Sequence, residues 1–443
     1  MTRPWFPDRL PADVWLRDGR CPAALLGSEL SQATDADGLV RIDLRVEHGR
    51  IAAIAPFGTA TDGLSLQGGQ VWPGLVDAHV HLDKTQIWTR RANPTGTHAG
   101  AVAAVTEDRV AHWSEADIEA RFRFGLECAH AHGTVAMRTH IDSYWPHARN
   151  GWAVFRRLQA EWSGRIALQA VALCPIEVYA SDEGPKLADL VAEHGGVLGM
   201  VSGSRVGPGE QLAPEFQDQL DRFFQLAEER DLALDLHVDE TAEPGARSLH
   251  AIAETAIRRD FRRPIQCGHI CSLAMQPDED AAATIRLCRD AGLRIVVLPM
   301  CNMYLQGRAP GRTPRWRGIT LVHELEAAAV PVSFASDNCR DPFYAYGDYD
   351  MVEVYREAVR IAQLDHPWGN WARSVCRTPA AALGLEGGEL KVGAPADLLL
   401  FRARTMTELL ARPQSDRIVL RAGQPLHATA PDWRELDHVL EPA

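Results

Sequence analysis

The segment PGLVDAHVHLDKTQ at residues 73–86 decides the fold. An apolar stretch of strand character ends there in two histidines, His79 and His81, which one residue separates. Because successive side chains of a strand point to opposite faces, both imidazoles lie on one face, which inside a barrel is turned to the axis. The segment therefore predicts a strand whose end can hold an ion. The alternative for each histidine is a hydrogen-bonded core position.

Seven further apolar segments of strand length follow, at residues 134–142, 166–175, 197–203, 232–240, 265–273, 294–302 and 330–338. Amphipathic stretches such as 114–133 and 215–230 separate them. This alternation predicts parallel strands joined by right-handed crossovers, and eight units over roughly 300 residues fit a closed (β/α)8 TIM-like barrel. A doubly wound open sheet is the alternative, although the chain lacks a Gly-x-Gly-x-x-Gly turn.

The two ends of the chain have a different residue pattern. Residues 39–54 alternate apolar and polar side chains around His48 and Gly49, which predicts a hairpin, and short β-rich runs return at 390–401 and 417–426. The predicted class is therefore α/β. We expect residues 71–384 to form the barrel, and residues 1–70 and 385–443 to form a small β-sandwich domain.

Composition limits the partners of the protein. A net charge of -13 over 443 residues argues against nucleic acid and favours a small-molecule ligand. No apolar run approaches about 18 residues, and the N-terminus lacks an export signal, so we expect neither membrane insertion nor secretion. Nine cysteines, an odd number, indicate reduced thiols and a cytoplasmic location. The sequence leaves open assembly into a homo-oligomer.

Further candidate ligands stand at other predicted strand ends. His237, His269 and Asp337 follow the fifth, sixth and eighth strands. Imidazole and carboxylate together suit Zn²⁺ or Fe²⁺, and an ion with an open position activates a water molecule. Glu240 lies three residues beyond His237, where its carboxylate can overhang the ion as a general acid or base. A solvated loop carboxylate is the alternative for Glu240.

These motifs, taken in order, resemble the amidohydrolase superfamily, and within it the bacterial cytosine deaminases and their triazine-acting relatives. Besides residues 73–86, the resemblance rests on LHVDE at 236–240, GHICS at 268–272 and ASDN at 335–338. RTHID at 138–142, YLQGR at 304–308, RGIT at 317–320 and DPFYAYG at 341–347 support it. The resemblance spans the whole chain.

The resemblance implies a residue role at each matching position. The implied metal ligands are His79, His81, His237 and Asp337. Glu240 and His269 match the two residues that transfer protons in that family. Asp337 is implied to take part in proton transfer as well as to bind the metal. The implied reaction is hydrolytic deamination of a free cytosine-like base. Many barrels of this kind hold two metals bridged by a lysine at the end of strand four, but this strand carries none, so we expect one divalent ion, Zn²⁺ or Fe²⁺.

The sequence departs from the cytosine enzyme at positions near the ring. Strand three offers Cys174, Pro175 and Ile176 where that enzyme has a glutamine. Asn338 replaces an aspartate and His98 an apolar residue. Because a neutral amide is easier to desolvate beside a methyl group than a carboxylate is, 5-methylcytosine becomes a candidate substrate.

Four residues are predicted to bind the substrate: Asn338, His98, Phe343 and Gln306. His140 and Asp142 are predicted to orient the metal ligands from behind. A hydrolase of another C–N bond, in an amino- or N-alkylamino-triazine or in isocytosine, is the second hypothesis. A barrel that serves as a non-catalytic scaffold is the third, and the intact set of ligand positions argues against it.

Overall fold

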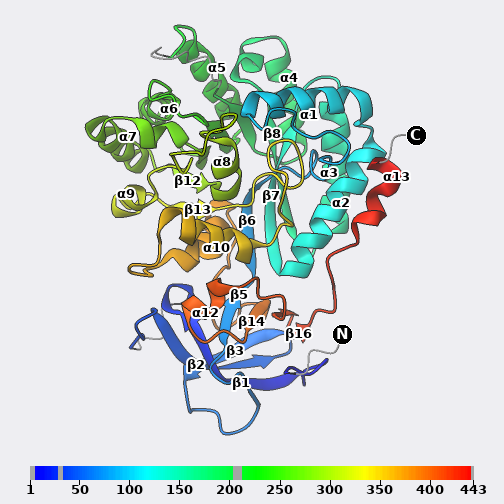
Figure 1. Cartoon of the computed structure of the whole chain (residues 1–443), viewed down its shortest axis with the longest axis vertical. Coiled ribbons are helices and arrows are strands. Elements are labelled where there is room, and N and C mark those ends of the chain that lie inside the picture. The colour runs from blue at the N-terminus through cyan, green and yellow to red at the C-terminus, as the bar shows by residue number, and fades with distance from the viewer. Residues whose placement is uncertain (1–4, 28–32, 203–211, 441–443) are drawn as a thin grey trace. The chain divides into compact units, whose positions relative to one another are not determined.

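The computed structural model describes residues 5–27, 33–202 and 212–440, and it divides the chain into two compact units (Figure 1). One unit groups Met1–Asp77, Glu127–Ala136 and Asp350–Ala430. The other groups Ala78–Leu126, Met137–Tyr349 and Pro431–Ala443. The domain boundaries expected after residues 70 and 384 stay a prediction.

The first unit contains a mixed sheet built from both ends of the chain. Its order over the described residues is β16-β15-β14-β5-β1-β2-β3, and β4 pairs with β1. The strands are β1 (Asp13–Pro22), β2 (Leu39–Glu47), β3 (Arg50–Pro56), β4 (Leu64–Ser65), β5 (Gln70–Pro73), β14 (Leu398–Phe401), β15 (Ile418–Arg421) and β16 (Gln424–Pro425). The predicted hairpin is confirmed by the antiparallel pairing of β2 with β3. The association of the two ends is also confirmed, whereas their packing as a two-layer sandwich stays a prediction.

Eight further strands correspond to the eight predicted segments. They are β6 (Leu75–Val80), β7 (Thr134–Asp142), β8 (Ala167–Leu173), β9 (Leu198–Val201), β10 (Leu234–Val238), β11 (Ile265–His269), β12 (Arg294–Val297) and β13 (Val332–Phe334). Within the described ranges they form two sheets, β6-β7-β8 and β9 to β13 in chain order. Parallel bridges Val171–Val197 and Pro175–Val201 connect β8 with β9, and a bridge Val80–Asp337 connects the end of β6 with the residues after β13.

The first predicted strand, at residues 71–82, is divided in the structure into β5 and β6 by Gly74. A Cβ atom at Gly74 would lie 2.2 Å from Val135 Cγ1, so the close approach of a neighbouring chain segment requires glycine there. The fourth predicted strand is shorter than expected, because β9 ends at Val201, and residue 203 lies outside the described residues.

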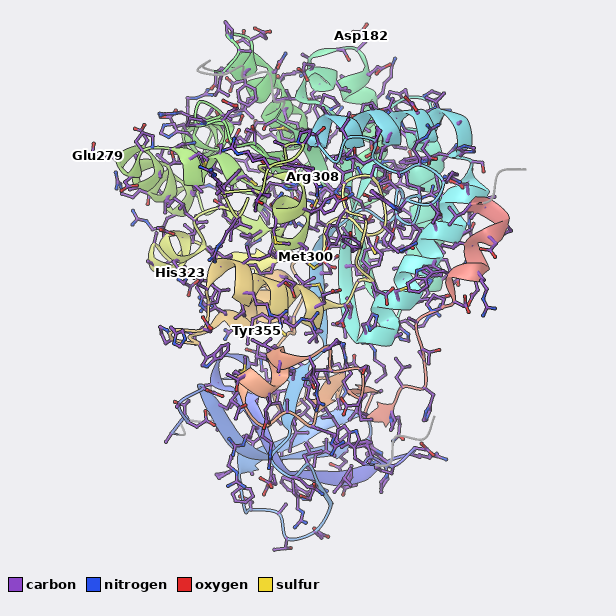
Figure 2. The ribbon with its side chains drawn as sticks, viewed as in Figure 1. Asp182, Glu279, Met300, Arg308, His323 and Tyr355 are labelled. Atoms are coloured by element: carbon purple, nitrogen blue, oxygen red, sulfur yellow. The ribbon has the colours of Figure 1, made fainter. Side chains whose placement is uncertain are left out.

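Helices alternate with these strands, which makes the fold mixed α/β. They are α1 (His98–His112), α2 (Glu115–His132), α3 (Ala148–Glu161), α4 (Glu183–Glu193), α5 (Phe216–Glu229), α6 (Ser248–Arg258), α7 (Asp278–Asp290), α8 (Pro299–Leu305), α9 (Val322–Ala327) and α10 (Met351–Ala362). The predicted helices at 114–133 and 215–230 are confirmed as α2 and α5. Exposed Asp182 and Glu279 project outward, whereas Met300 of α8 is buried (Figure 2). Over the described part of the chain, no helix combines the length and the apolar character needed to cross a membrane.

A buried ion pair stabilises the first unit. Asp350 caps α10 by accepting a hydrogen bond from the Val352 N–H at 2.9 Å, and its Oδ1 also accepts one from Arg417 Nη1 at 2.7 Å. Both side chains of the pair are largely buried. Burial opposes ionisation of Asp350, but the Arg417 guanidinium outweighs it and lowers the pKa of the carboxyl to about 2. The pair therefore depends on an ionised Asp350.

We expect Asp350→Ala to lower the free energy of unfolding by about 3–5 kcal/mol, because buried Arg417 loses its paired carboxylate. Urea denaturation at pH 7 measures this, with exposed Asp62→Ala as a control that changes it by less than about 0.5 kcal/mol. Because the folded pKa lies below the ordinary value of 3.8, the stabilisation is present above that pH and lost as the pH falls toward 2. Equal stability of Asp350→Ala and wild type at pH 7 would contradict this role.

Candidate active site

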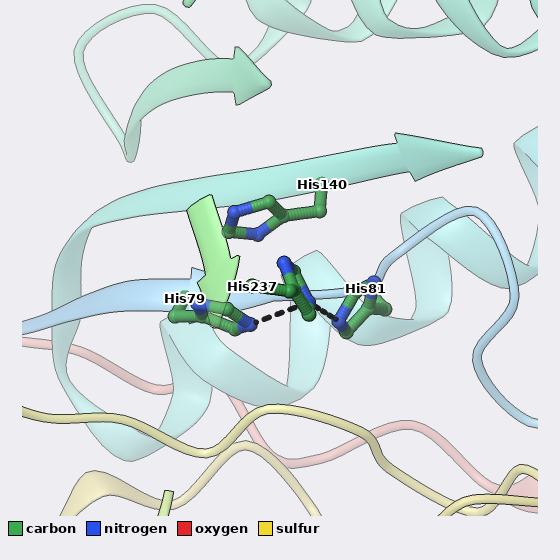
Figure 3. A group of neighbouring side chains, drawn as sticks. All are labelled: His79, His81, His140 and His237. Carbon is green, nitrogen blue, oxygen red and sulfur yellow. Dashed lines mark hydrogen bonds between the residues drawn. The ribbon is translucent and has the colours of Figure 1, made fainter. Parts of the chain in front are cut away.

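Three imidazoles and one carboxylate converge at the ends of three strands. His79 lies in β6, His81 follows it, His237 lies in β10, and Asp337 follows β13. The Nε2 atom of His237 lies 3.1 Å from that of His79 and 3.2 Å from that of His81 (Figure 3). Asp337 Oδ1 lies 3.2 Å from His81 Nε2 and 3.6 Å from His79 Nε2. The structure therefore brings all four predicted ligands together.

The chemistry of this group, called the ligand cluster below, fits a metal cation. Burial lowers the pKa of His79, His81 and His237 well below the ordinary value, so the imidazoles are neutral, which is the form that binds metal. Their Nδ1 atoms find no hydrogen-bond partner within the described residues, and their Nε2 atoms face one another. Ligand atoms about 2.0–2.2 Å from a shared tetrahedral ion lie about 3.4 Å apart, close to the separations observed.

His269 completes one side of the ligand cluster. It ends β11, and one of its ring nitrogens lies within 4.8 Å of the ligand atoms of His79 and Asp337. A Cβ atom at the preceding Gly268 would lie 2.9 Å from His79 Cε1, so glycine leaves room for that imidazole. His269 and Asp337 adopt left-handed backbone conformations, with φ of 69° and 63°. Such costly conformations cluster at functional sites.

Glu240 lies beside the ligand cluster rather than in it. Its Oε1 lies 3.4 Å from His269 Nδ1 and accepts a hydrogen bond from Asn302 Nδ2 at 3.1 Å. Its Oε2 lies 3.4 Å from His98 Nε2. Burial opposes ionisation of Glu240, but His269 and His98 outweigh it and lower the pKa of the carboxyl to about 2. The carboxylate is thus held by neighbours that can exchange protons with it.

A second layer of polar side chains supports the histidines. The His140 ring lies 4.0 Å from the His79 ring, centroid to centroid, and His140 Nε2 lies 3.3 Å from Asp235 Oδ1. Asp235 Oδ2 accepts hydrogen bonds from Arg138 Nη1 at 3.0 Å and from Gln266 Nε2 at 2.7 Å. The structure therefore brings His140 to the ligand cluster, and its orienting role stays a prediction.

Asp142 is held by a different set of contacts. Its carboxylate accepts hydrogen bonds from Lys84 Nζ at 3.0 Å and from Arg109 Nη1 at 2.9 Å. Its backbone N–H donates to Asp83 Oδ2 at 2.7 Å. The described contacts of the Asp142 carboxylate are thus to two cations, Lys84 after β6 and Arg109 in α1, and its role in orienting the metal ligands stays a prediction.

A cavity of about 370 Å³ opens beside the ligand cluster. It is lined by His81, His237, His269, Asp337 and Glu240 on one side, and by Lys84, His98, Val102, Val105, Thr106, Arg109, Asp142, Tyr144, Leu173, Pro175, Glu177, Val201, Asn338 and Phe343 elsewhere. Three of the four predicted substrate contacts, Asn338, His98 and Phe343, are therefore on the wall. Gln306 is not among the described lining residues, and its Nε2 donates to the Glu240 carbonyl at 3.1 Å instead.

Asn338 has a well-defined partner at the cavity wall. Its Nδ2 donates a hydrogen bond to Asp341 Oδ2 at 2.7 Å, and its Oδ1 lies 3.7 Å from Cys301 Sγ. Asp341 Oδ1 accepts hydrogen bonds from the backbone N–H groups of Phe343 and Tyr344 at 2.8 and 3.2 Å. Burial raises the pKa of Asp341 to about 6 against these hydrogen bonds, so it is ionised at neutral pH.

Sequence reasoning missed several of these residues. Asp235 stands two positions before His237, so the alternation of the strand places it on the same face, and this spacing could have identified it. Asn302 lies in α8, and no pattern in the sequence connects it with Glu240. Arg109, Tyr144 and Glu177 come from separate segments, and only the fold brings them to one wall.

Comparison with known proteins identifies relatives of this chain. It is 50% identical over 410 residues to a pterin deaminase from Rhizobium rhizogenes (strain K84), covering 91% of this chain and 92% of that protein. It is 26% identical to N-isopropylammelide isopropyl amidohydrolase from Pseudomonas sp. (strain ADP), covering 83% and 86%. The crystal structure of 5-methylcytosine deaminase from Klebsiella pneumoniae liganded with 5-fluorocytosine superposes with a TM-score of 0.80 at 23% identity, covering 94% and 98%, which shows a shared fold.

A family model described as "Amidohydrolase family" matches residues 153–427, more than half of the chain. That match includes His237, His269 and Asp337. Together with the identity of 50% over nine-tenths of a relative, it shows that the chain belongs to the amidohydrolase family.

Proposed function

We propose that this enzyme hydrolytically removes the amino group of a pterin, a 2-amino-4-oxopteridine, to give the 2,4-dioxo product and ammonia. The observation that carries the proposal is the 50% identity to a pterin deaminase across nine-tenths of both chains. The prediction of cytosine or 5-methylcytosine as substrate rests on the resemblance of short sequence motifs. A pterin and a cytosine-like base would undergo the same reaction, which is hydrolytic loss of an amino group from a ring carbon bonded to one or two ring nitrogens.

The cavity supports a bicyclic substrate. Its volume of about 370 Å³ lies in the range of roughly 300–1,000 Å³ that is usual for small-molecule sites. Its lining includes His81, His237, Asp337 and Glu240, and it also carries Lys84, Arg109 and Tyr144. A pterin is flat and rich in nitrogen and oxygen atoms, so polar groups along the wall as well as at the reacting end suit it.

The residues divide the reaction between them. A divalent ion held by His79, His81, His237 and Asp337 would lower the pKa of a water molecule and so supply a nucleophile at neutral pH. Glu240 would take up one of the two protons of this water and pass it to the adjacent ring nitrogen as the water oxygen attacks the amine-bearing carbon. Asp337 and His269 would take up the second proton and pass it to the amino group, which leaves as ammonia. The carbonyl oxygen of the product comes from water.

One ion per chain completes the proposal. The sequence has lysine only at Lys84, Lys186 and Lys391. Lys84 Nζ bonds to Asp142, and Lys186 lies in α4, so neither supports a second, lysine-bridged ion. We also propose that the strands from β6 to β13 close into a barrel, that residues 1–70 and 385–443 form the separate β domain, and that the protein works in the cytoplasm.

We expect about one Zn²⁺ or Fe²⁺ per chain by elemental analysis of the purified protein. His237→Ala should lower both metal content and activity below about a tenth of wild type, because it removes one of few bonds to the ion. Exposed His323→Ala, on α9 (Figure 2), is the matched control and should retain both. A reproducible content of two ions, both required for activity, would contradict the mononuclear site.

Glu240→Gln should bind metal normally and lose about 10²–10⁴-fold in kcat, because an amide keeps the shape but cannot take up and release a proton. Assays of ammonia release at fixed times measure kcat, and elemental analysis of the same preparation measures the metal content. Glu243→Gln, in the same loop, serves as the control and should keep wild-type turnover. Retention of more than about a tenth of kcat in Glu240→Gln would mean that another group transfers the proton.

A substrate panel tests the proposed function directly. Ammonia release is measured from pterin, cytosine, 5-methylcytosine, isocytosine and amino-triazines at equal metal loading. We expect the highest kcat/KM for pterin, by at least about tenfold, since polar groups built for one ring system reject rings that leave them unpaired. A higher value for a pyrimidine or a triazine would overturn the assignment while leaving the deaminase chemistry in place.

A further inference from the structure

The hydrogen bonds around Asn338 fix which of its two polar atoms faces a ligand. A side-chain amide can turn over and present either an acceptor oxygen or a donor N–H₂ group, and the surrounding network decides between them. Here the deciding partner is Asp341. An ionised carboxylate only accepts hydrogen bonds, so the Asn338 atom 2.7 Å from Asp341 Oδ2 is the amide nitrogen.

Asp341 is itself held in one orientation. Its Oδ1 accepts the backbone N–H groups of Phe343 and Tyr344, so Oδ2 remains for Asn338. Asp341 is fully buried, and Asn338 is 4% exposed. With its nitrogen committed to Asp341, Asn338 has Oδ1 left for a molecule in the cavity. The other neighbour of that oxygen is the Cys301 thiol at 3.7 Å, which is a weak donor.

We propose that Asp341 is a positioning residue that fixes Asn338 as a hydrogen-bond acceptor, so that the site selects rings presenting an N–H group at this wall. This inference rests on the proposed function, because it concerns recognition of the ring that is deaminated. A pterin carries such groups, as its lactam N–H and its amino group. A 5-methyl group, the substituent that the sequence suggests beside Asn338, offers no N–H.

One single substitution should reverse this polarity. In Asp341→Asn, the backbone N–H groups of Phe343 and Tyr344 still bind the amide oxygen, which turns the new N–H₂ group toward Asn338. Asn338 must then present its oxygen to that group and its own N–H₂ to the cavity. Asn338→Asp alone should not reverse it, because repulsion makes one of the two facing carboxyl groups bind a proton and donate it to the other, which leaves an acceptor oxygen at position 338 for the cavity.

The double substitution should restore the wild-type pattern. In Asn338→Asp/Asp341→Asn, the amide at position 341 donates to the carboxylate at position 338, and the second oxygen of that carboxylate faces the cavity as an acceptor. The number of carboxylates is the same as in wild type. A purely structural role for Asp341 predicts instead that the double variant is no better than Asp341→Asn.

The experiment measures kcat/KM and Kd for pterin in wild type, both single variants and the double variant, with metal content and Tm recorded for each. We expect Asp341→Asn to lose at least about tenfold in kcat/KM, the double variant to recover at least about tenfold over Asp341→Asn, and Asn338→Asp to stay within about tenfold of wild type. A matched control is Asp43→Asn in the other unit, a buried aspartate that accepts the backbone N–H groups of Asp18, Gly58 and Ala60. It should lower Tm without changing kcat/KM.

Wild-type activity of Asp341→Asn, or a double variant no better than Asp341→Asn, would overturn the proposal. If wild type neither binds nor deaminates pterin, the proposed function fails. The four proteins are then compared on whichever panel compound wild type deaminates, so the polarity of Asn338 is still decided by recovery or its absence in the double variant.

Discussion

The structure depends on one electrostatic constraint, the burial of three imidazoles with their Nε2 atoms turned toward one another. Neutral imidazoles gain nothing from such an arrangement unless a cation shares their lone pairs, and the Asp337 carboxylate beside them is itself fully buried. An ion offsets both costs at once. Several features of the fold serve this arrangement, including the glycine at position 268 and the left-handed backbone of His269 and Asp337.

The same constraint separates the roles of two carboxylates that lie near each other. Burial and the charge of Glu240 raise the pKa of Asp337 well above its ordinary value in the absence of an ion, whereas His269 and His98 lower that of Glu240 to about 2. Burial therefore opposes a charge on Asp337, and a bound cation would favour it. Glu240 is ionised by its protein neighbours alone, and it stays outside the ligand cluster, where a proton carrier is needed.

Much of the fold and the metal site could be predicted from the sequence, because both depend on short-range patterns. Buried parallel strands appear as apolar runs, and ligands at strand ends appear as histidines or an aspartate where those runs stop. The partners of Asp142 and Gln306 could not be predicted. Asp142 meets Lys84 and Arg109, and Gln306 meets the Glu240 carbonyl, through contacts between segments far apart in the chain. Whether the predicted two-layer sandwich forms likewise depends on how the sheet curves. The alternation of apolar and polar residues along the strands does not determine that curvature.

The identity of the substrate depends on the cavity wall, and short sequence motifs describe this part of the site least well. The ligand cluster is a property that a whole family can share, as the TM-score of 0.80 at 23% identity to a 5-methylcytosine deaminase illustrates for the fold. The cavity wall is assembled from separate segments, among them Arg109 in α1, Tyr144 after β7 and Glu177 after β8. Each of these residues can change without disturbing the metal ligands. Even at a wall position next to a ligand, the residue type alone is insufficient, because Asn338 acquires its polarity from Asp341, three residues farther along the chain.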